Sequence, residues 1–280
     1  MSEHDPRAER LVSEIAGYGG VLVAFSGGVD SGVVLAAAAR ALGPGRVAAM
    51  TAASPAVPVA ELDVAREVCA ELGVAGHVDR TGELDVVGYR VNGPRRCFFC
   101  KSTLLDRAAA LAGELGLPAV ATGTNASDVA AGFRPGIRAA AERGARAPLA
   151  DIGLDKRAVR AVARGWGLSI WDKPAAPCLS SRIAYGVPVT PARLSRVERA
   201  ELAARARLAG HGLRDLRVRD LGDSVRLELD LALVDRARSD AALLDALAAA
   251  GFAGLPVTVA PFRSGALNDL LPDPASWRHA

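Results

Sequence analysis

The chain has 280 residues, half of them apolar, and its 34 Lys and Arg against 31 Asp and Glu leave a formal net charge of +3. This composition predicts one or two globular domains and excludes collagen-like and low-complexity proteins. The amino-terminal segment lacks the apolar core of a signal peptide, and no later run is long enough to span a bilayer, so we expect a cytoplasmic protein without a membrane partner. No dense Lys/Arg arm is present, which argues against a nucleic-acid partner.

A glycine-rich turn between a strand and a helix gives the strongest local signal. Residues 21–25 are apolar without alternation, which is typical of a buried parallel strand, and residues 33–42 predict a helix. Glycines let the backbone come close to a ligand, and the amides at a helix start suit an anion. A bare Gly-Gly pair would indicate only an ordinary turn, but here hydroxyl donors and an aspartate, a magnesium ligand, flank it. The candidate residues are Ser26, Gly27, Gly28, Asp30 and Ser31.

The whole string resembles the PP-loop of the ATP pyrophosphatase superfamily, whose members cleave ATP between its alpha and beta phosphates to adenylate a substrate. It is not a Walker loop, because no Gly-Lys-Ser/Thr follows, and it is not a dinucleotide fingerprint. The resemblance implies ATP and Mg²⁺ as cofactors and says nothing about the substrate.

The segments that follow alternate between strand and helix patterns. Strands are predicted at residues 47–53, 74–78 and 119–122, and helices at 61–72, 104–115 and 158–165. This alternation favours an α/β fold with a parallel sheet and helices on both faces.

Ligands of such folds bind at the carboxyl ends of the strands, so Thr51, Gly123 and Asn125 are expected at the same edge as the phosphate loop. Asp128 would supply either a second carboxylate for magnesium or a helix-capping turn, and the sequence leaves both open.

Beyond residue 185 the pattern changes. Helices are predicted at 194–208 and 243–250, and strands at 214–219, 224–229 and 256–260. The sequence therefore predicts a PP-loop domain over residues 1–185 and a smaller α+β domain over residues 186–280.

Three of the four cysteines lie in the first half of the chain. Cys69 falls on the apolar stripe of a predicted helix, where a small buried side chain is expected. Cys97 and Cys100 stand three residues apart just before another helix, so a helical turn would put both thiols on one face. Basic neighbours and the helix start favour the thiolate forms.

The fourth, Cys178, comes from a distant segment. Prolines stiffen this segment, and two serines and Arg182 follow the cysteine. A zinc site would need a fourth ligand, which the four scattered histidines do not provide. A redox dithiol at Cys97 and Cys100 would leave Cys178 without a task. Three thiolates on an iron–sulfur cluster would leave one iron open for chemistry. The spacing does not choose among these alternatives.

A PP-loop with three such cysteines resembles two groups of sulfur-inserting enzymes: the tRNA thiolases and the LarE-type sulfur transferases, which make the nickel-pincer nucleotide cofactor of lactate racemase. A zinc-stabilised nucleotide-binding module without catalysis is a third interpretation. The LarE type matches far more of the chain, from about residue 10 to 268. The matching segments are residues 26–31, 92–101, 123–128, 134–136, 171–186 and 261–265.

This resemblance implies a substrate, pyridinium-3,5-biscarboxylic acid mononucleotide, whose carboxylates are adenylated and then converted to thiocarboxylates. In single-cysteine members the residue matching Cys178 attacks the acyl adenylate and gives up its own sulfur. Members with an additional Cys-x-x-Cys resemble a subgroup that holds a 4Fe–4S cluster, here on Cys97, Cys100 and Cys178. Lys173 and Arg182 are then candidates to neutralise charge that develops in the reaction.

The resemblance also concerns the substrate phosphate and the assembly. Arg134 and Arg138 are candidates for binding the substrate phosphate, with surface salt bridges as the alternative for both. Family members form trimer-based hexamers, which implies a homo-oligomer. The chain departs from the family pattern at residues 129–132, which are Val-Ala-Ala-Gly, where the family usually carries acidic residues.

Overall fold

The computed structural model describes residues 5–132, 134–263 and 265–267, and these form two compact units. Unit 1 consists of residues 1–83 and 97–176, and unit 2 of residues 84–96 and 177–280. The expected domain boundary after residue 185 stays a prediction. In the part of the chain that the structure describes, no helix has the length and apolar character that crossing a membrane requires.

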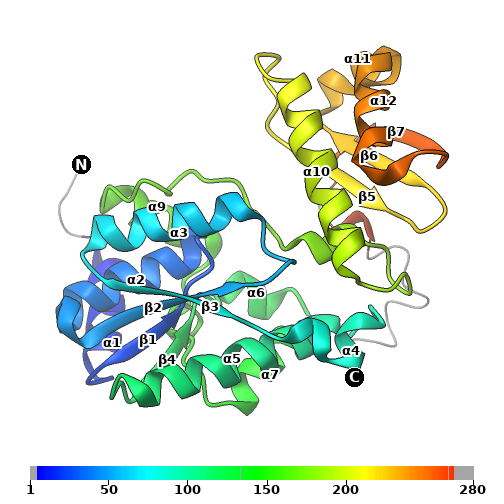
Figure 1. Ribbon diagram of the computed structural model, residues 1–280. Helices are drawn as coiled ribbons and strands as arrows, with labels where there is room; N and C mark the ends of the chain where they lie inside the picture. Colours follow the sequence, from blue (N-terminus) through cyan, green and yellow to red (C-terminus); the bar gives the residue numbers. More distant parts are fainter. Residues whose placement is uncertain (1–4, 133, 264, 268–280) are drawn as a thin grey trace. The chain divides into compact units, whose positions relative to one another are not determined.

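Unit 1 is built on a four-stranded parallel sheet with strand order β3-β2-β1-β4 (Figure 1). This arrangement confirms the predicted α/β class. The strands are β1 (Val21–Ala24), β2 (Val47–Ala53), β3 (Ala75–Arg80) and β4 (Ala119–Thr122). The helices are α1 (Pro6–Ala16), α2 (Val29–Leu42), α3 (Val59–Leu72), α5 (Arg96–Glu114), α6 (Ala126–Ala130), α7 (Pro135–Glu142), α8 (Pro148–Asp151) and α9 (Lys156–Gly165).

Helices cover both faces of this sheet, which explains why β1 and most of β2 are apolar without alternation. On one face Val21 and Val23 pack with side chains of α1, α2, α3 and α9. On the other face Leu22 and Met50 pack against α5. Because β1 lies between β2 and β4 and is buried on both sides, it fixes the position of the loop that follows it.

Helix α5 begins earlier than the sequence pattern predicts. The expected helix starts at residue 104, whereas α5 starts at Arg96 and already contains Cys97 and Cys100. Their spacing of three residues on a helix places both thiols on the same side of its first turn.

Unit 2 contains a three-stranded mixed sheet, in which β5 (Leu216–Asp220) runs antiparallel to β6 (Val225–Leu229) and β7 (Val257–Pro261) runs parallel to it. The long helix α10 (Pro191–Arg207) packs on β5, with Leu194, Val197 and Ala204 fully buried. The other helices are α4 (Val87–Arg90), α11 (Val234–Ser239) and α12 (Ala241–Leu247). A 3-10 helix spans Leu179–Arg182, directly after Cys178.

Asn92 anchors residues 84–96 within unit 2. It is fully buried, has a φ of 59°, and its Nδ2 donates to the carbonyls of Ile183, Ala184 and Val187 at 3.3, 2.8 and 2.8 Å. Its Oδ1 accepts a hydrogen bond of 2.7 Å from Nη1 of Arg96. One amide side chain therefore satisfies several polar groups that water does not reach.

We predict that Asn92→Ala lowers the free energy of unfolding by about 2–4 kcal/mol, because it leaves buried carbonyls without a donor and because alanine adopts the positive φ of this position less readily than asparagine does. Urea unfolding followed by circular dichroism measures this loss. Asn92→Gly should be about 1 kcal/mol more stable than Asn92→Ala, because glycine adopts a positive φ without strain, but it should not restore the lost hydrogen bonds. Val91→Ala, at a neighbouring exposed position, is the matched control. An Asn92→Ala protein within about 0.5 kcal/mol of the unsubstituted chain would contradict the anchoring role.

Candidate functional site

The glycine-rich loop closes on itself through its two serines. Residues 25–28 connect β1 to α2, and Gly27 has a φ of 71°, which side chains rarely tolerate. Oγ of Ser31 accepts from the backbone N–H of Ser26 at 3.2 Å, donates to the carbonyl of Gly28 at 3.2 Å, and lies 3.1 Å from Oγ of Ser26. The loop therefore leads directly into the amino terminus of the 14-residue helix α2, a position that favours a bound phosphate.

The end of β4 packs directly against this loop. A β-carbon at Gly123 would lie 2.5 Å from the backbone N and 2.8 Å from Cα of Ser31. Only glycine allows so close an approach of two backbones. The structure therefore brings Gly123 and the phosphate loop together, as expected for the carboxyl ends of adjacent parallel strands.

Asn125 connects the two aspartates proposed as magnesium ligands. Its Nδ2 donates to Oδ1 of Asp30 at 3.1 Å, and its Oδ1 accepts from the N–H of Asp128 at 3.0 Å, which caps α6. Burial raises the pKa of Asp30; the Asn125 bond opposes this shift and the Asp128 charge adds to it. Two carboxylates in this setting fit a Mg²⁺ ion, because the cation would offset both the burial and the repulsion.

Two cationic side chains, of Lys156 and Arg134, approach Asp128. Nζ of Lys156 lies 3.0 Å from Oδ1 of Asp128, and Nη2 of Arg134 lies 3.8 Å from the same atom. Sequence reasoning missed Lys156, although it is one of only three lysines in the chain. Arg138 forms a pair of 2.9 Å with Glu142 one turn away on α7, as an exposed surface salt bridge would.

Lys173 lies against the other side of the phosphate loop. Its Nζ donates to the carbonyl of Gly27 at 2.9 Å and to Oε2 of Glu61 at 2.7 Å. The carbonyl of Lys173 accepts a hydrogen bond of 2.8 Å from Arg160. Local sequence pattern gives no signal for Glu61, because its partner Lys173 is 112 residues away in the chain.

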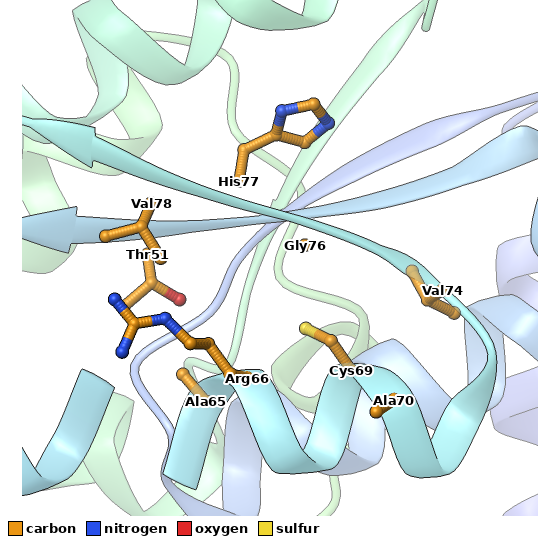
Figure 2. Close-up of a pocket in the computed structure, with 9 residues that line it drawn as sticks. All are labelled: Thr51, Ala65, Arg66, Cys69, Ala70, Val74, Gly76, His77 and Val78. Carbon is orange, nitrogen blue, oxygen red and sulfur yellow. The ribbon is translucent and has the colours of Figure 1, made fainter. Parts of the chain in front are cut away.

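Thr51 is buried on β2 and lines a cavity of about 270 Å³ between α3 and the outer strand β3 (Figure 2). Cys69 is 6% exposed and faces the same cavity from α3, next to Gly76, whereas His77 projects from the opposite face of β3. Cys69 is thus a small buried side chain, as predicted, and burial raises the pKa of its thiol. The cavity is lined by Thr51, Ala65, Arg66, Cys69, Ala70, Val74, Gly76, His77 and Val78.

The first turn of α5 combines two thiols with a lysine. Cys97 is exposed and Cys100 is partly buried, and burial lowers the pKa of the Lys101 ammonium that follows them. The amino terminus of α7 packs on this turn, since a β-carbon at Gly136 would lie 3.6 Å from the carbonyl of Cys97. Arg134, at the N-cap of α7, therefore belongs to the same part of unit 1.

In unit 2, Arg182 holds the backbone around Cys178. Its side chain is 4% exposed; Nε and Nη2 donate to the Glu201 carboxylate at 2.9 and 3.1 Å. Nη1 donates to the carbonyls of Pro177 and Cys178 and to Oγ of Ser181. All three nitrogens of the guanidinium thus have partners inside unit 2, which suits a positioning role. The catalytic role expected for Arg182 stays a prediction.

None of the four cysteines, all of which lie within the described residues, forms a disulfide. Cys97 and Cys100 belong to unit 1 and Cys178 to unit 2. Across residues 5–132, 134–263 and 265–267, no group of three or more His, Cys, Asp or Glu side chains is placed so that it could hold a metal ion.

Comparison with known proteins identifies the family to which the chain belongs. The asparagine synthase family model matches residues 18–88, which include the phosphate loop. An uncharacterized protein of Synechocystis sp. is 40% identical over 253 residues, covering 89% of this chain and 92% of that protein. Another uncharacterized protein, from Methanocaldococcus jannaschii, is 27% identical over 139 residues, half of this chain.

A functionally named relative matches nearly the whole chain. The pyridinium-3,5-bisthiocarboxylic acid mononucleotide synthase of Lactiplantibacillus plantarum is 33% identical over 268 residues, 93% of both chains. Together with the closed phosphate loop after β1, this similarity decides the family. The chain belongs to the LarE-type sulfur transferases of the PP-loop superfamily.

Proposed function

We propose that this chain is an ATP-dependent sulfur transferase that converts the carboxylates of pyridinium-3,5-biscarboxylic acid mononucleotide into thiocarboxylates, for the nickel-pincer cofactor of lactate racemase. The observation that carries the proposal is the match over 93% of both chains to a synthase named for the corresponding bisthiocarboxylic acid mononucleotide. The substrate is thus a small nucleotide. A tRNA thiolase, the other sulfur-inserting alternative, has no such full-length support.

The first half of the reaction is adenylation. A substrate carboxylate oxygen attacks the α-phosphorus of ATP, the bond to the bridging oxygen breaks, and pyrophosphate leaves. The phosphate loop and the α2 amino terminus bind the phosphates, and Mg²⁺ on Asp30 and Asp128 would offset their charge. Lys173, with its ammonium at the Gly27 carbonyl, is placed to stabilise charge on the leaving group.

The second half is sulfur transfer. A nucleophilic sulfur attacks the acyl carbon of the adenylate, and AMP leaves with the electron pair of the broken C–O bond. Cys178 is proposed to form part of the sulfur site, where Arg182 holds its backbone through the carbonyls of Pro177 and Cys178. We propose that Cys97, Cys100 and Cys178 hold a 4Fe–4S cluster, whose open iron would supply a replaceable sulfide.

The chain neighbours of these cysteines support this ligand set. In unit 2, Nη1 of Arg96 donates to the carbonyl of Ser180 at 2.8 Å. Arg96 directly precedes Cys97 in the sequence, and Ser180 follows Cys178 by two residues.

We further propose that Arg134 contributes to binding the substrate phosphate. Arg138 is the weaker candidate, because Glu142 pairs with it. We also propose that the protein is a trimer-based hexamer.

Asp30→Asn is expected to lower substrate-dependent pyrophosphate release about 100-fold, because the amide cannot offset the charge of Mg²⁺. A coupled pyrophosphate assay with the pyridinium nucleotide measures it. Asp63→Asn, an exposed carboxylate that pairs with Arg66, is the matched control. Unchanged release by Asp30→Asn would remove Asp30 from the site. If tRNA and not the pyridinium nucleotide stimulated release by the unsubstituted protein, the proposed substrate would be wrong.

Cys178→Ala is expected to abolish formation of the thiocarboxylate while leaving pyrophosphate release in a single turnover. Only the sulfur step needs this thiol, whereas adenylation depends on unit 1. Mass spectrometry of the nucleotide product measures the transfer. Cys69→Ala removes a buried thiol without a proposed role and should leave the transfer intact. Thiocarboxylate formed by Cys178→Ala would show that the assignment of Cys178 is wrong.

Anaerobically purified protein is expected to contain iron and to absorb visible light, and Cys97→Ala to lose both, because one of three cluster ligands is gone. Iron and zinc analysis with an absorbance spectrum measures this, again with Cys69→Ala as the control. A colourless protein that contains zinc would rule out the cluster.

A further inference from the structure

A partly buried ion pair beside the phosphate loop points to a residue that the proposed reaction does not use. Nζ of Lys173 lies 2.7 Å from Oε2 of Glu61, and the two side chains are 17% and 15% exposed. We propose that Glu61 is a positioning residue, which holds the Lys173 ammonium at the phosphate loop and so controls adenylation without being a catalytic group itself. This inference rests on the proposed function.

The position of Glu61 follows from helix α3. Glu61 lies in the first turn of α3, where the helix dipole favours a carboxylate. Its main chain also contacts the loop, since a β-carbon at Gly27 would lie 3.2 Å from the carbonyl oxygen of Glu61 and 3.5 Å from Oε2. The absent side chain of Gly27 therefore lets the carboxylate lie directly beside the loop backbone.

Lys173 is fixed independently, through its own backbone. Arg160 donates to the carbonyls of Trp171 and Lys173 at 3.1 and 2.8 Å. Three residues before Lys173, Ile170 packs on α2 so closely that a β-carbon at Gly32 would lie 2.4 Å from its Cδ1. The segment that carries the lysine is thus docked on the helix that follows the phosphate loop, and only its side chain needs further guidance.

The charges explain what this guidance achieves. An ammonium has three N–H donors, and within the described residues Glu61 and Gly27 accept two of them. The third is available to a phosphate oxygen. Without Glu61 the flexible side chain would lose its direction, whereas without Lys173 a poorly solvated carboxylate would stand next to the phosphates and repel them. Replacing Lys173 alone should therefore impair adenylation at least as much as replacing Lys173 and Glu61 together.

A double-mutant cycle tests the proposal. ATP–pyrophosphate exchange with the pyridinium nucleotide is measured for the unsubstituted protein, Glu61→Gln, Lys173→Met and the double variant. Glu61→Gln should lower kcat/KM for ATP about 10- to 100-fold, mainly through kcat, and Lys173→Met by more. The double variant should be no worse than Lys173→Met alone. Thermal unfolding verifies that each variant is folded.

Glu71→Gln is the matched control. Glu71 lies on the same helix and its carboxylate accepts hydrogen bonds from the N–H and Oγ of Ser169 at 3.3 and 2.6 Å, so it anchors the same segment without contacting Lys173. Its exchange should match that of the unsubstituted protein. Additive losses in the double variant, Glu61→Gln within about twofold of the unsubstituted protein, or an equal loss in Glu71→Gln would each overturn the proposal.

The cycle also separates this inference from the proposed function. If the unsubstituted protein showed no exchange that depends on the pyridinium nucleotide, the proposed substrate would fail. The same four proteins would then be compared by their affinity for ATP in calorimetry. Coupling between the two positions in that affinity would still support the positioning role of Glu61, and its absence would refute it.

Discussion

The close packing of backbone on both sides of the phosphate loop is the constraint on which unit 1 depends. On one side the end of β4 approaches so closely that a β-carbon at Gly123 would lie 2.5 Å from the N of Ser31. On the other side a β-carbon at Gly27 would lie within 3.6 Å of both Glu61 and Lys173. Because side chains are absent at these two positions, polar groups from the end of β4, from α3 and from the segment of Lys173 can surround the helix start. The buried strand β1 holds the loop in register while these groups gather around it.

Unit 2 positions its cysteine by a different means, through buried charges that have partners. Arg182 is shared between the Glu201 carboxylate and the backbone around Cys178, and Arg219 forms a second buried pair with Glu228 at 2.7 Å. Such pairs add little net stability, because desolvation offsets the attraction. They do specify one arrangement, since a guanidinium with every nitrogen occupied has a single orientation. The loop that carries Cys178 is therefore defined by polar geometry more than by apolar packing.

The sequence was sufficient to predict the features that depend on local pattern. Apolar runs without alternation located β1 and β2, because a parallel sheet covered on both faces needs no polar positions. The start of α5 was placed eight residues too late, since Gly93, Pro94 and the aromatic pair after Cys97 weaken the helical pattern there.

Contacts between distant side chains could not be predicted in this way. Glu61 and Lys173 are 112 residues apart, and Asn92 reaches carbonyls more than 90 residues away. The sequence makes Arg182 a candidate to neutralise charge that develops in the reaction, whereas its pairing with Glu201 becomes visible only when α10 is in place. Local pattern located the candidate segments, and only the fold showed which side chains bind and which ones position them.

The choice of lysine over arginine connects these observations. Only three of the 34 basic residues are lysine, and all three lie in unit 1: Lys101 after Cys100, Lys156 at Asp128 and Lys173 at Gly27. A guanidinium is wide and planar and binds best to a matching pair of oxygens, whereas an ammonium fits into a narrow space between single oxygens. Nζ of Lys173 lies within 2.9 Å of two oxygens from different segments, a geometry that suits a point charge. In a chain whose cations are otherwise arginine, this geometry explains the presence of a lysine at the phosphate loop.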